Sequence, residues 1–329
     1  MTLLKKTSRR VIKPKAVGKE RQKGFQLFFA GSQNKLAEQY LKVNGCNRLA
    51  SQLVDRNVIA GWIYSRLDGI SKGNLFVDSG AFSAHTRNAE VDVDAYCNYL
   101  NGIDDDLYIY AQVDKIPGVY RQPKSKQQLL DAPLQSWNNY LYMREKVKSP
   151  DKLLPIFHQG EDFSWLSQML EATFDGKHVP YIGISPANDQ HINEKEKFIE
   201  KCFEMIAKSS NPNVKTHAFG MTSLNLLESY PFTSADSTTW IMTGAMGSIM
   251  SKYGVITLSS GRLNAPDHIR KMPKDAQTAI QKYVESHGFD IEELATDYKQ
   301  RVIFNIMYMS EWAANYVYSP SKVKRKKLF

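Results

Sequence analysis

Short apolar runs alternate with helical segments along most of this chain of 329 residues. Eight of these runs read as buried strands, because each is short and bounded by polar or turn-forming residues. They cover residues 25–31, 75–80, 107–114, 153–159, 181–185, 215–220, 232–237 and 254–260. Strands that alternate with helices usually pair in parallel, so the pattern predicts an α/β fold, a single (β/α)8 TIM barrel. An open, doubly wound sheet is the alternative.

The connecting segments are mostly helical. We expect helices at residues 35–43, 47–56, 92–100, 125–147, 163–174, 194–208, 223–228, 274–286 and 291–316. The stretch 237–254 combines Trp240 with several methionines and glycines. It is either a loop and helix that close over a site or a packed connection, and Met and Trp are more often packing residues.

Positive charge is concentrated at the two ends of the chain. Residues 1–24 contain nine Lys or Arg and one acid, and residues 319–329 are also basic. We expect a basic flexible arm at 1–24, one barrel domain at 25–318 and a basic tail at 319–329. The whole chain has 43 Lys and Arg against 34 Asp and Glu, a net charge of +9, which favours a polyanionic partner. The arms either contact nucleic-acid phosphates or are solvated tails.

The three cysteines, Cys46, Cys97 and Cys202, are far apart and have no zinc-ligand spacing. We interpret them as reduced thiols of a cytoplasmic protein and expect no metal and no cofactor. No apolar run has the roughly 20 residues that cross a bilayer, and the basic amino terminus lacks the apolar region of a secretory signal, so no membrane partner is expected.

Polar residues and glycines recur where the predicted strands end. One such residue alone is weak, since Asp after a strand often caps the next helix. In a barrel, however, the carboxyl ends of all strands face one site, so the recurrence predicts a common site. The residues are Asp78, Asp114, Gln159, Gly183, Gly220 and Asp236.

Three carboxylates at one site indicate chemistry at a sugar carbon. One carboxylate can attack the anomeric carbon while another moves the proton of the leaving group. A third, with a Gln amide, can read the edge of a heterocycle, and glycines such as Gly183 and Gly220 let a backbone approach a ligand closely. Phe82 and Phe219 either stack on a base or pack in the core.

Five short segments carry a family resemblance in the same order along the chain. They are 77–82 (VDSGAF), 158–160 (HQG), 181–185 (YIGIS), 217–221 (HAFGM) and 233–237 (TSADS). These segments resemble the Asp-Ser-Gly-Gly, Gln-Gly-Gly, Gly-Gly-Leu-Ala, His-Tyr-Leu-Met-Gly and Phe-Asp-Cys motifs of tRNA-guanine transglycosylases. The resemblance spans about residues 25 to 260 and implies a base-exchanging pentosyltransferase.

The resemblance implies two catalytic roles. Asp236 would attack C1′ of the target guanosine and form a covalent ribosyl ester, and Asp78 would be the general acid and base for the outgoing and incoming bases. The incoming base would be a 7-deazaguanine such as preQ0 or preQ1.

The resemblance also implies a base-binding set. Asp114 would bind the Watson–Crick edge, Gln159 and the backbone N–H of Gly183 would hold the carbonyl side, and Phe82 and Phe219 would sandwich the ring.

Two departures from the family favour DNA over tRNA as the substrate. The family's zinc site is missing, since no cysteine follows Asp236, and its Leu-Pro-Thr-Arg segment is replaced by residues 238–240 (TTW). A compact, zinc-less, basic barrel is similar to the DNA transglycosylases of phages and bacterial modification clusters. An unusual tRNA enzyme, an inactive nucleic-acid-binding barrel and a glycosidase-like barrel are the alternatives. Partner proteins and the oligomeric state stay open.

Overall fold

The computed structural model describes residues 24–31, 34–119, 121–187, 190–221 and 223–318. The basic tail expected at 319–329, and all of the expected basic arm except Gly24, lie outside these residues.

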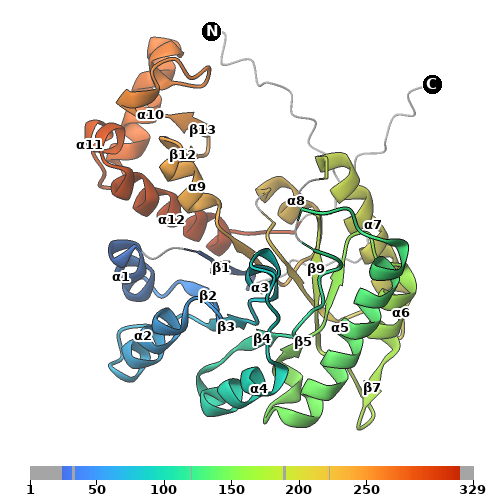
Figure 1. Cartoon of the computed structure of the whole chain (residues 1–329). Helices are drawn as coiled ribbons and strands as arrows, with labels where there is room; N and C mark the ends of the chain where they lie inside the picture. The colour runs from blue at the N-terminus through green and yellow to red at the C-terminus, as the bar shows by residue number, and fades with distance from the viewer. Residues whose placement is uncertain (1–23, 32–33, 120, 188–189, 222, 319–329) are drawn as a thin grey trace, which may run out of the picture.

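A parallel sheet of nine strands forms the centre of the molecule (Figure 1). The strands are β1 (Gln26–Phe29), β2 (Asn47–Ser51), β3 (Leu75–Asp78), β4 (Ile109–Ala111), β5 (Leu153–Leu154), β6 (Ile156–His158), β9 (Tyr181–Ser185), β10 (Lys215–Ala218) and β11 (Ser234–Ser237). Their order in the sheet is β5-β4-β3-β2-β1-β11-β10-β9-β6. The two edge strands, β5 and β6, are separated in sequence by Pro155 alone. The sheet therefore curls into a nearly closed, barrel-like α/β structure.

Helices connect successive strands and cover the outside of the sheet (Figure 1). They are α1 (Lys35–Val43), α2 (Arg56–Leu67), α3 (Ala81–Thr86), α4 (Val93–Gly102), α5 (Lys126–Lys146), α6 (Phe163–Glu171), α7 (Ile192–Lys208) and α8 (Leu224–Ser229). A small hairpin of β7 (Thr173–Phe174) and β8 (Lys177–His178) follows α6. Helix α5 begins with a capping box in which Ser125 and Gln128 bond each other's backbone N–H, and it continues through Pro133.

Alternate residues of each strand enter two different cores. Phe28, Phe76 and Leu154 belong to a cluster enclosed by the sheet. Their strand neighbours, such as Leu27 and Val77, belong to the larger cluster between sheet and helices. This is the two-residue period of a strand that is buried on both faces.

Residues 239–314 form a lobe beside the barrel (Figure 1). It contains α9 (Thr239–Ala245), β12 (Ser248–Ser251), β13 (Gly254–Thr257), α10 (Lys274–Glu285), α11 (Ile291–Thr296) and α12 (Tyr298–Ala314). A third cluster fills it, including Ile256, Ile280 and Phe304. Helix α12 packs on α9, β12 and α1, and so joins the lobe to the barrel.

Three predicted elements differ from the structure. Residues 47–51, expected to begin a helix, form β2, which pairs with β1 and β3. The expected eighth strand at 254–260 is β13, which pairs antiparallel with β12 outside the barrel. The first two residues of β13 are exposed, which a barrel strand would not tolerate. The predicted helix 291–316 is divided at Asp297, whose carboxylate caps α12.

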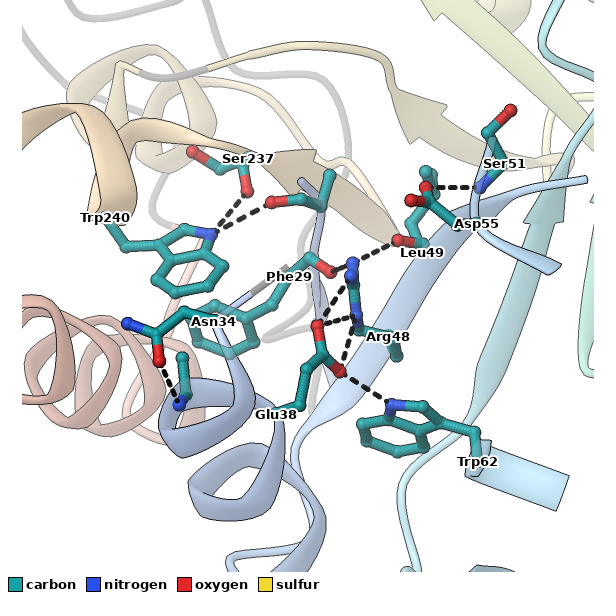
Figure 2. Close-up of polar contacts among 12 residues, drawn as sticks. Phe29, Asn34, Glu38, Arg48, Leu49, Ser51, Asp55, Trp62, Ser237 and Trp240 are labelled. Atoms are coloured by element: carbon teal, nitrogen blue, oxygen red, sulfur yellow. Dashed lines mark hydrogen bonds and ion pairs between the residues drawn. The ribbon is translucent and has the colours of Figure 1, made fainter. Parts of the chain in front are cut away.

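Buried polar side chains fasten α1 to the barrel (Figure 2). The fully buried Arg48 of β2 places its Nη2 2.8 Å from Glu38 Oε1 of α1, and its Nη1 donates to the Phe29 carbonyl at 2.6 Å. Trp62 Nε1 of α2 donates to Glu38 Oε2 at 3.0 Å. Trp240 attaches α9 to the barrel: its Nε1 donates to the Ala30 carbonyl at 3.2 Å and to the Ser237 carbonyl at 3.0 Å. Trp240 is wholly buried, so this part of the stretch 237–254 is a packed connection.

Candidate functional site

Asp78 lies at the carboxyl end of β3, where the chain turns sharply into α3. Gly80 has φ +84 and donates its N–H to Asp78 Oδ2 at 2.9 Å. A Cβ at Gly80 would lie 2.5 Å from Leu53 Cβ and 2.7 Å from Ser51 Oγ. Only glycine fits this turn, which holds the carboxylate at the end of the strand.

Asp236 lies at the carboxyl end of β11 and is 8% exposed. Its Oδ1 accepts the backbone N–H of Gly220 at 2.8 Å and lies 3.3 Å from His217 Nε2. Gly220 has φ +56, which turns its N–H toward the carboxylate. Gly220, where we expected the backbone to approach a ligand, therefore donates its N–H to Asp236.

The three predicted carboxylates interact. Burial raises the pKa of Asp78 to about 7, and the negative charges of Asp114 and Asp236 add to the rise against the opposing N–H bonds of Gly80 and Ser79. Carboxylates influence one another in this way only when they share a site. A pKa near neutrality suits a group that both gives and takes a proton.

Asp114 follows β4 and pairs with a histidine. Its Oδ2 lies 3.0 Å from His158 Nε2 at the end of β6, although the approach is not aligned as a hydrogen bond. Burial lowers the pKa of His158, but the carboxylates of Asp114 and Glu161 outweigh burial and raise it overall. The raised pKa favours the charged form of His158 beside Asp114.

A pocket of about 370 Å³ opens beside Asp114. Its walls come from α3, the segments after α3 and β4, and α5. Asp114, His85, Lys115, Gln135 and Asn139 supply polar groups to the lining. Of the three predicted carboxylates, Asp114 lines the pocket, whereas Asp78 and Asp236 do not.

Gln159 is held by main-chain atoms. Its Oε1 accepts the N–H of Ala187 at 3.0 Å, and its Nε2 donates to the Glu194 carbonyl at 3.3 Å. The amide expected to bind a base is thus hydrogen-bonded at both ends. It links the segment after β6 to the segment after β9 and to the first turn of α7.

The backbone N–H of Gly183, predicted to hold the base, already has a partner inside the sheet. Its N–H donates to the Pro155 carbonyl at 2.7 Å, because Gly183 lies inside β9. A Cβ there would lie 2.5 Å from Phe219 Cε2. Gly183 makes room for the Phe219 ring, and its N–H is used in strand pairing.

The two predicted stacking rings lie in different surroundings. Phe82 on α3 is 61% exposed. Phe219 is half-buried and packs edge-on against His217, at 4.6 Å between ring centroids, and Phe76, at 5.8 Å. Phe219 therefore belongs to the barrel interior, whereas Phe82 lies at the surface.

Three residues that follow one another by hydrogen bonds from Asp236 into the barrel have no predicted role. His217, Ser234 and Tyr181 form hydrogen bonds inside the barrel. The available signal was polarity within strands: His217 and Ser234 occupy buried positions that an ordinary core fills with apolar residues.

Comparisons with known proteins identify no family. No family of proteins and no curated protein matches the sequence. Among solved structures, a short chain dehydrogenase from Mycobacterium smegmatis is similar at 9% identity with a TM-score of 0.25, over 69% of this chain and 97% of that chain. A likeness this low carries no argument about fold or function. Within the described ranges, no helix is long and apolar enough to cross a membrane, and no group of three His, Cys, Asp or Glu is arranged to hold a metal ion.

Proposed function

We propose that this protein is a transglycosylase that replaces guanine in DNA with a 7-deazaguanine base of the preQ0 type. The observation that carries the proposal is the pairing of Asp78, whose pKa is raised to about 7, with Asp236, which is held by N–H donors at the same end of the sheet. Base exchange at a sugar carbon needs one group that shuttles a proton near neutral pH and one that attacks.

We also propose that the barrel-like sheet is a (β/α)8 barrel. Strands β5 and β6 are separated by Pro155 alone, and β5 pairs with β4 while β6 pairs with β9. Counted as one strand, they connect the two edges of the sheet. Asp78, Asp114 and Asp236 then stand at the carboxyl ends of three strands, where barrel enzymes carry their sites.

In the proposed first step, a carboxylate oxygen of Asp236 attacks C1′ of the target nucleotide. The bond from C1′ to N9 of guanine breaks, its electron pair leaves with the base, and the proton of Asp78 neutralises the departing guanine. In the second step the incoming base loses its N9 proton to Asp78 and attacks C1′. The ester bond breaks, and Asp236 is restored as a carboxylate.

Asp114 is proposed to recognise the base. Its carboxylate accepts N–H groups such as those of a guanine edge, and the pocket beside it can admit a ring. Gln159 is proposed to act on the base indirectly, since its amide fixes the segment that follows β6 and β9. The amide could hydrogen-bond the base directly only after a base took the place of its partners Ala187 and Glu194.

DNA is proposed as the substrate over tRNA. The net charge of +9 suits a phosphate backbone, and residues 1–24 and 319–329 concentrate it. The missing zinc ligands after Asp236 separate the chain from the tRNA enzymes that it resembles.

The test is a base-exchange assay with the full chain. Protein is incubated with preQ0 and either DNA or unmodified tRNA, and the nucleosides are identified by mass spectrometry after digestion. A 7-deazaguanine nucleoside in DNA that disappears with Asp236→Asn supports the proposal. Incorporation into tRNA alone would show that the substrate is tRNA and not DNA. Incorporation into neither nucleic acid refutes base exchange by the protein alone.

A further inference from the structure

A chain of polar side chains runs through the apolar interior of the barrel toward Asp236. Tyr181 Oη lies 2.5 Å from Ser234 Oγ, and Ser234 Oγ lies 2.5 Å from His217 Nδ1. His217 Nε2 then lies 3.3 Å from Asp236 Oδ1. Strands β9, β10 and β11 supply the four residues, so the barrel itself aligns them.

The surroundings keep His217 neutral. Its side chain is wholly buried, and Phe28, Phe76 and Phe219 lie edge-on around it at 6.0, 4.9 and 4.6 Å between ring centroids. Burial lowers the pKa of His217, and the Asp236 carboxylate only partly opposes this. A neutral imidazole carries one N–H and one acceptor nitrogen.

The partners of His217 decide which nitrogen carries the proton. A carboxylate only accepts, so Nε2 must donate to Asp236. Nδ1 is then an acceptor for the Ser234 hydroxyl, and Ser234 Oγ accepts the Tyr181 hydroxyl. This arrangement gives a partner to the donors of Tyr181, Ser234 and His217, whereas the other tautomer would set a lone pair of Nε2 against the carboxylate.

Serine, histidine and aspartate also form the triads of hydrolases, but the order of exposure is reversed here. In a triad the serine faces the substrate. Here Ser234 and His217 are both 0% exposed, and Asp236 is the member at the strand end. The group that can meet a substrate is therefore the carboxylate.

The two oxygens of Asp236 have different surroundings. Oδ1 receives the Gly220 N–H and faces His217, whereas Oδ2 forms no hydrogen bond with the residues that the structure describes. We propose that His217, held by Ser234 and Tyr181 as the Nε2–H tautomer, is a positioning residue that fixes Asp236 so that Oδ2 attacks the sugar carbon. The role of Oδ2 rests on the proposed function, but the tautomer does not.

The tautomer is tested by nitrogen NMR on the full chain labelled at histidine with 15N. The His217 signal is assigned from its loss in His217→Gln. We expect a neutral Nε2–H ring at pH 7 to 8, and a rise in the Nδ1–H form in Ser234→Ala. A charged ring, or an Nδ1–H ring in the wild type, overturns the inference.

The positioning role is tested in the exchange assay. His217→Leu removes the donor, and we expect kcat to fall on the order of 100-fold, since an imprecisely held group loses about this much. KM for the incoming base should stay nearly constant, and His217→Gln, which keeps an N–H donor, should recover much of kcat. The matched control is Thr216→Val, the preceding residue of β10, whose buried hydroxyl has no hydrogen-bond partner among the residues that the structure describes.

The outcomes separate the inference from the function. Unchanged kcat in a His217→Leu protein that melts like the wild type overturns the inference and leaves base exchange standing. A wild-type protein that exchanges no base in DNA or tRNA overturns the proposed function and, with it, the role of Oδ2. The tautomer measurement then still reports on the hydrogen-bonded chain.

Discussion

Asp78 combines properties that oppose stability and favour chemistry. It is a carboxyl group in a desolvated position with two other carboxylates nearby, and these causes raise its pKa to about 7. A site chosen for stability alone would not hold three acids together, because their charges repel. Proteins accept such strain mainly at functional sites.

The first prediction concerns stability and pH. The pKa of Asp78 is higher in the folded than in the unfolded state, so folding takes up a proton between about pH 4 and pH 7 and ionised Asp78 destabilises the fold above that range. Asp78→Asn should therefore be more stable than the wild type at pH 8, by at most about 4 kcal/mol, and gain little at pH 4. Urea unfolding of both proteins at the two pH values measures the difference. An equal effect at both values would contradict the raised pKa.

The second prediction concerns the same substitution and activity. Asn cannot accept the proton that the exchange requires, so Asp78→Asn should lower the exchange rate by about 100- to 10,000-fold. The rate of the wild type should depend on pH near 7, where Asp78 titrates. A variant that is both more stable and fully active would remove Asp78 from the mechanism.

The third prediction concerns the turn that holds Asp78. Gly80→Ala forces a side chain into a left-handed φ of +84 and against Leu53 and Ser51, and should destabilise the protein by about 1–3 kcal/mol or more. Gly69→Ala is the control, since Gly69 has φ +70 but open space around it. Denaturation midpoints compare the two. An equal loss in both variants would mean that the close approach of Leu53 has no effect.

At the scale of elements, the sequence predicted where most strands and helices lie but not every partner. The pattern that ends in Asp78 and Asp236 was correct, because an apolar run followed by an acid or glycine is local information. The prediction for 47–51 is wrong because Arg48 is typical of a solvated helix, and no local pattern shows that Glu38 of α1 pairs with it in the interior. Gln159 and Gly183 were predicted to contact a base directly. In the structure the Gln159 amide accepts the N–H of Ala187, and the Gly183 N–H donates to Pro155. No local sequence pattern reveals these two partners.

The fourth prediction concerns the attachment of α1 to β2. Removing one partner of a buried ion pair leaves the other charge unpaired, so Arg48→Met should destabilise the protein by about 3–5 kcal/mol. The exposed pair of Lys197 and Glu194 is the comparison, and Lys197→Met should change stability by no more than about 1 kcal/mol. Thermal unfolding of both variants measures the contrast. A loss in Arg48→Met as small as in the control would show that Glu38 and Trp62 do not depend on Arg48.

At the scale of the whole molecule, the chain divides its apolar residues among the barrel interior, the layer under the helices and the lobe. Composition and alternation predicted the α/β class because they sum over the entire chain. The lobe was not predicted, since the apolar run of β13 resembles a barrel strand and only its pairing with β12 distinguishes the two.

The fifth prediction concerns the charge of the whole chain. If DNA is bound through its phosphates, affinity should fall steeply as salt rises, with a slope that reports the number of phosphate contacts. Deleting residues 1–23, which carry nine Lys or Arg, should make that slope shallower while leaving the unfolding temperature unchanged. Fluorescence anisotropy with a labelled duplex measures both slopes. Identical slopes for the two proteins would mean that residues 1–23 make no contact with DNA phosphates.

The most direct measurement of the central claim, nucleophilic attack by Asp236, is a covalent trap. Full-length protein is incubated with a labelled DNA strand without an incoming base and then separated on a denaturing gel. The proposal predicts a slow-migrating protein–DNA band in the wild type, loss of that band in Asp236→Ala, and its disappearance from the wild type when preQ0 or guanine is added. A band of equal intensity in Asp236→Ala, or base exchange by that variant at the wild-type rate, would contradict it.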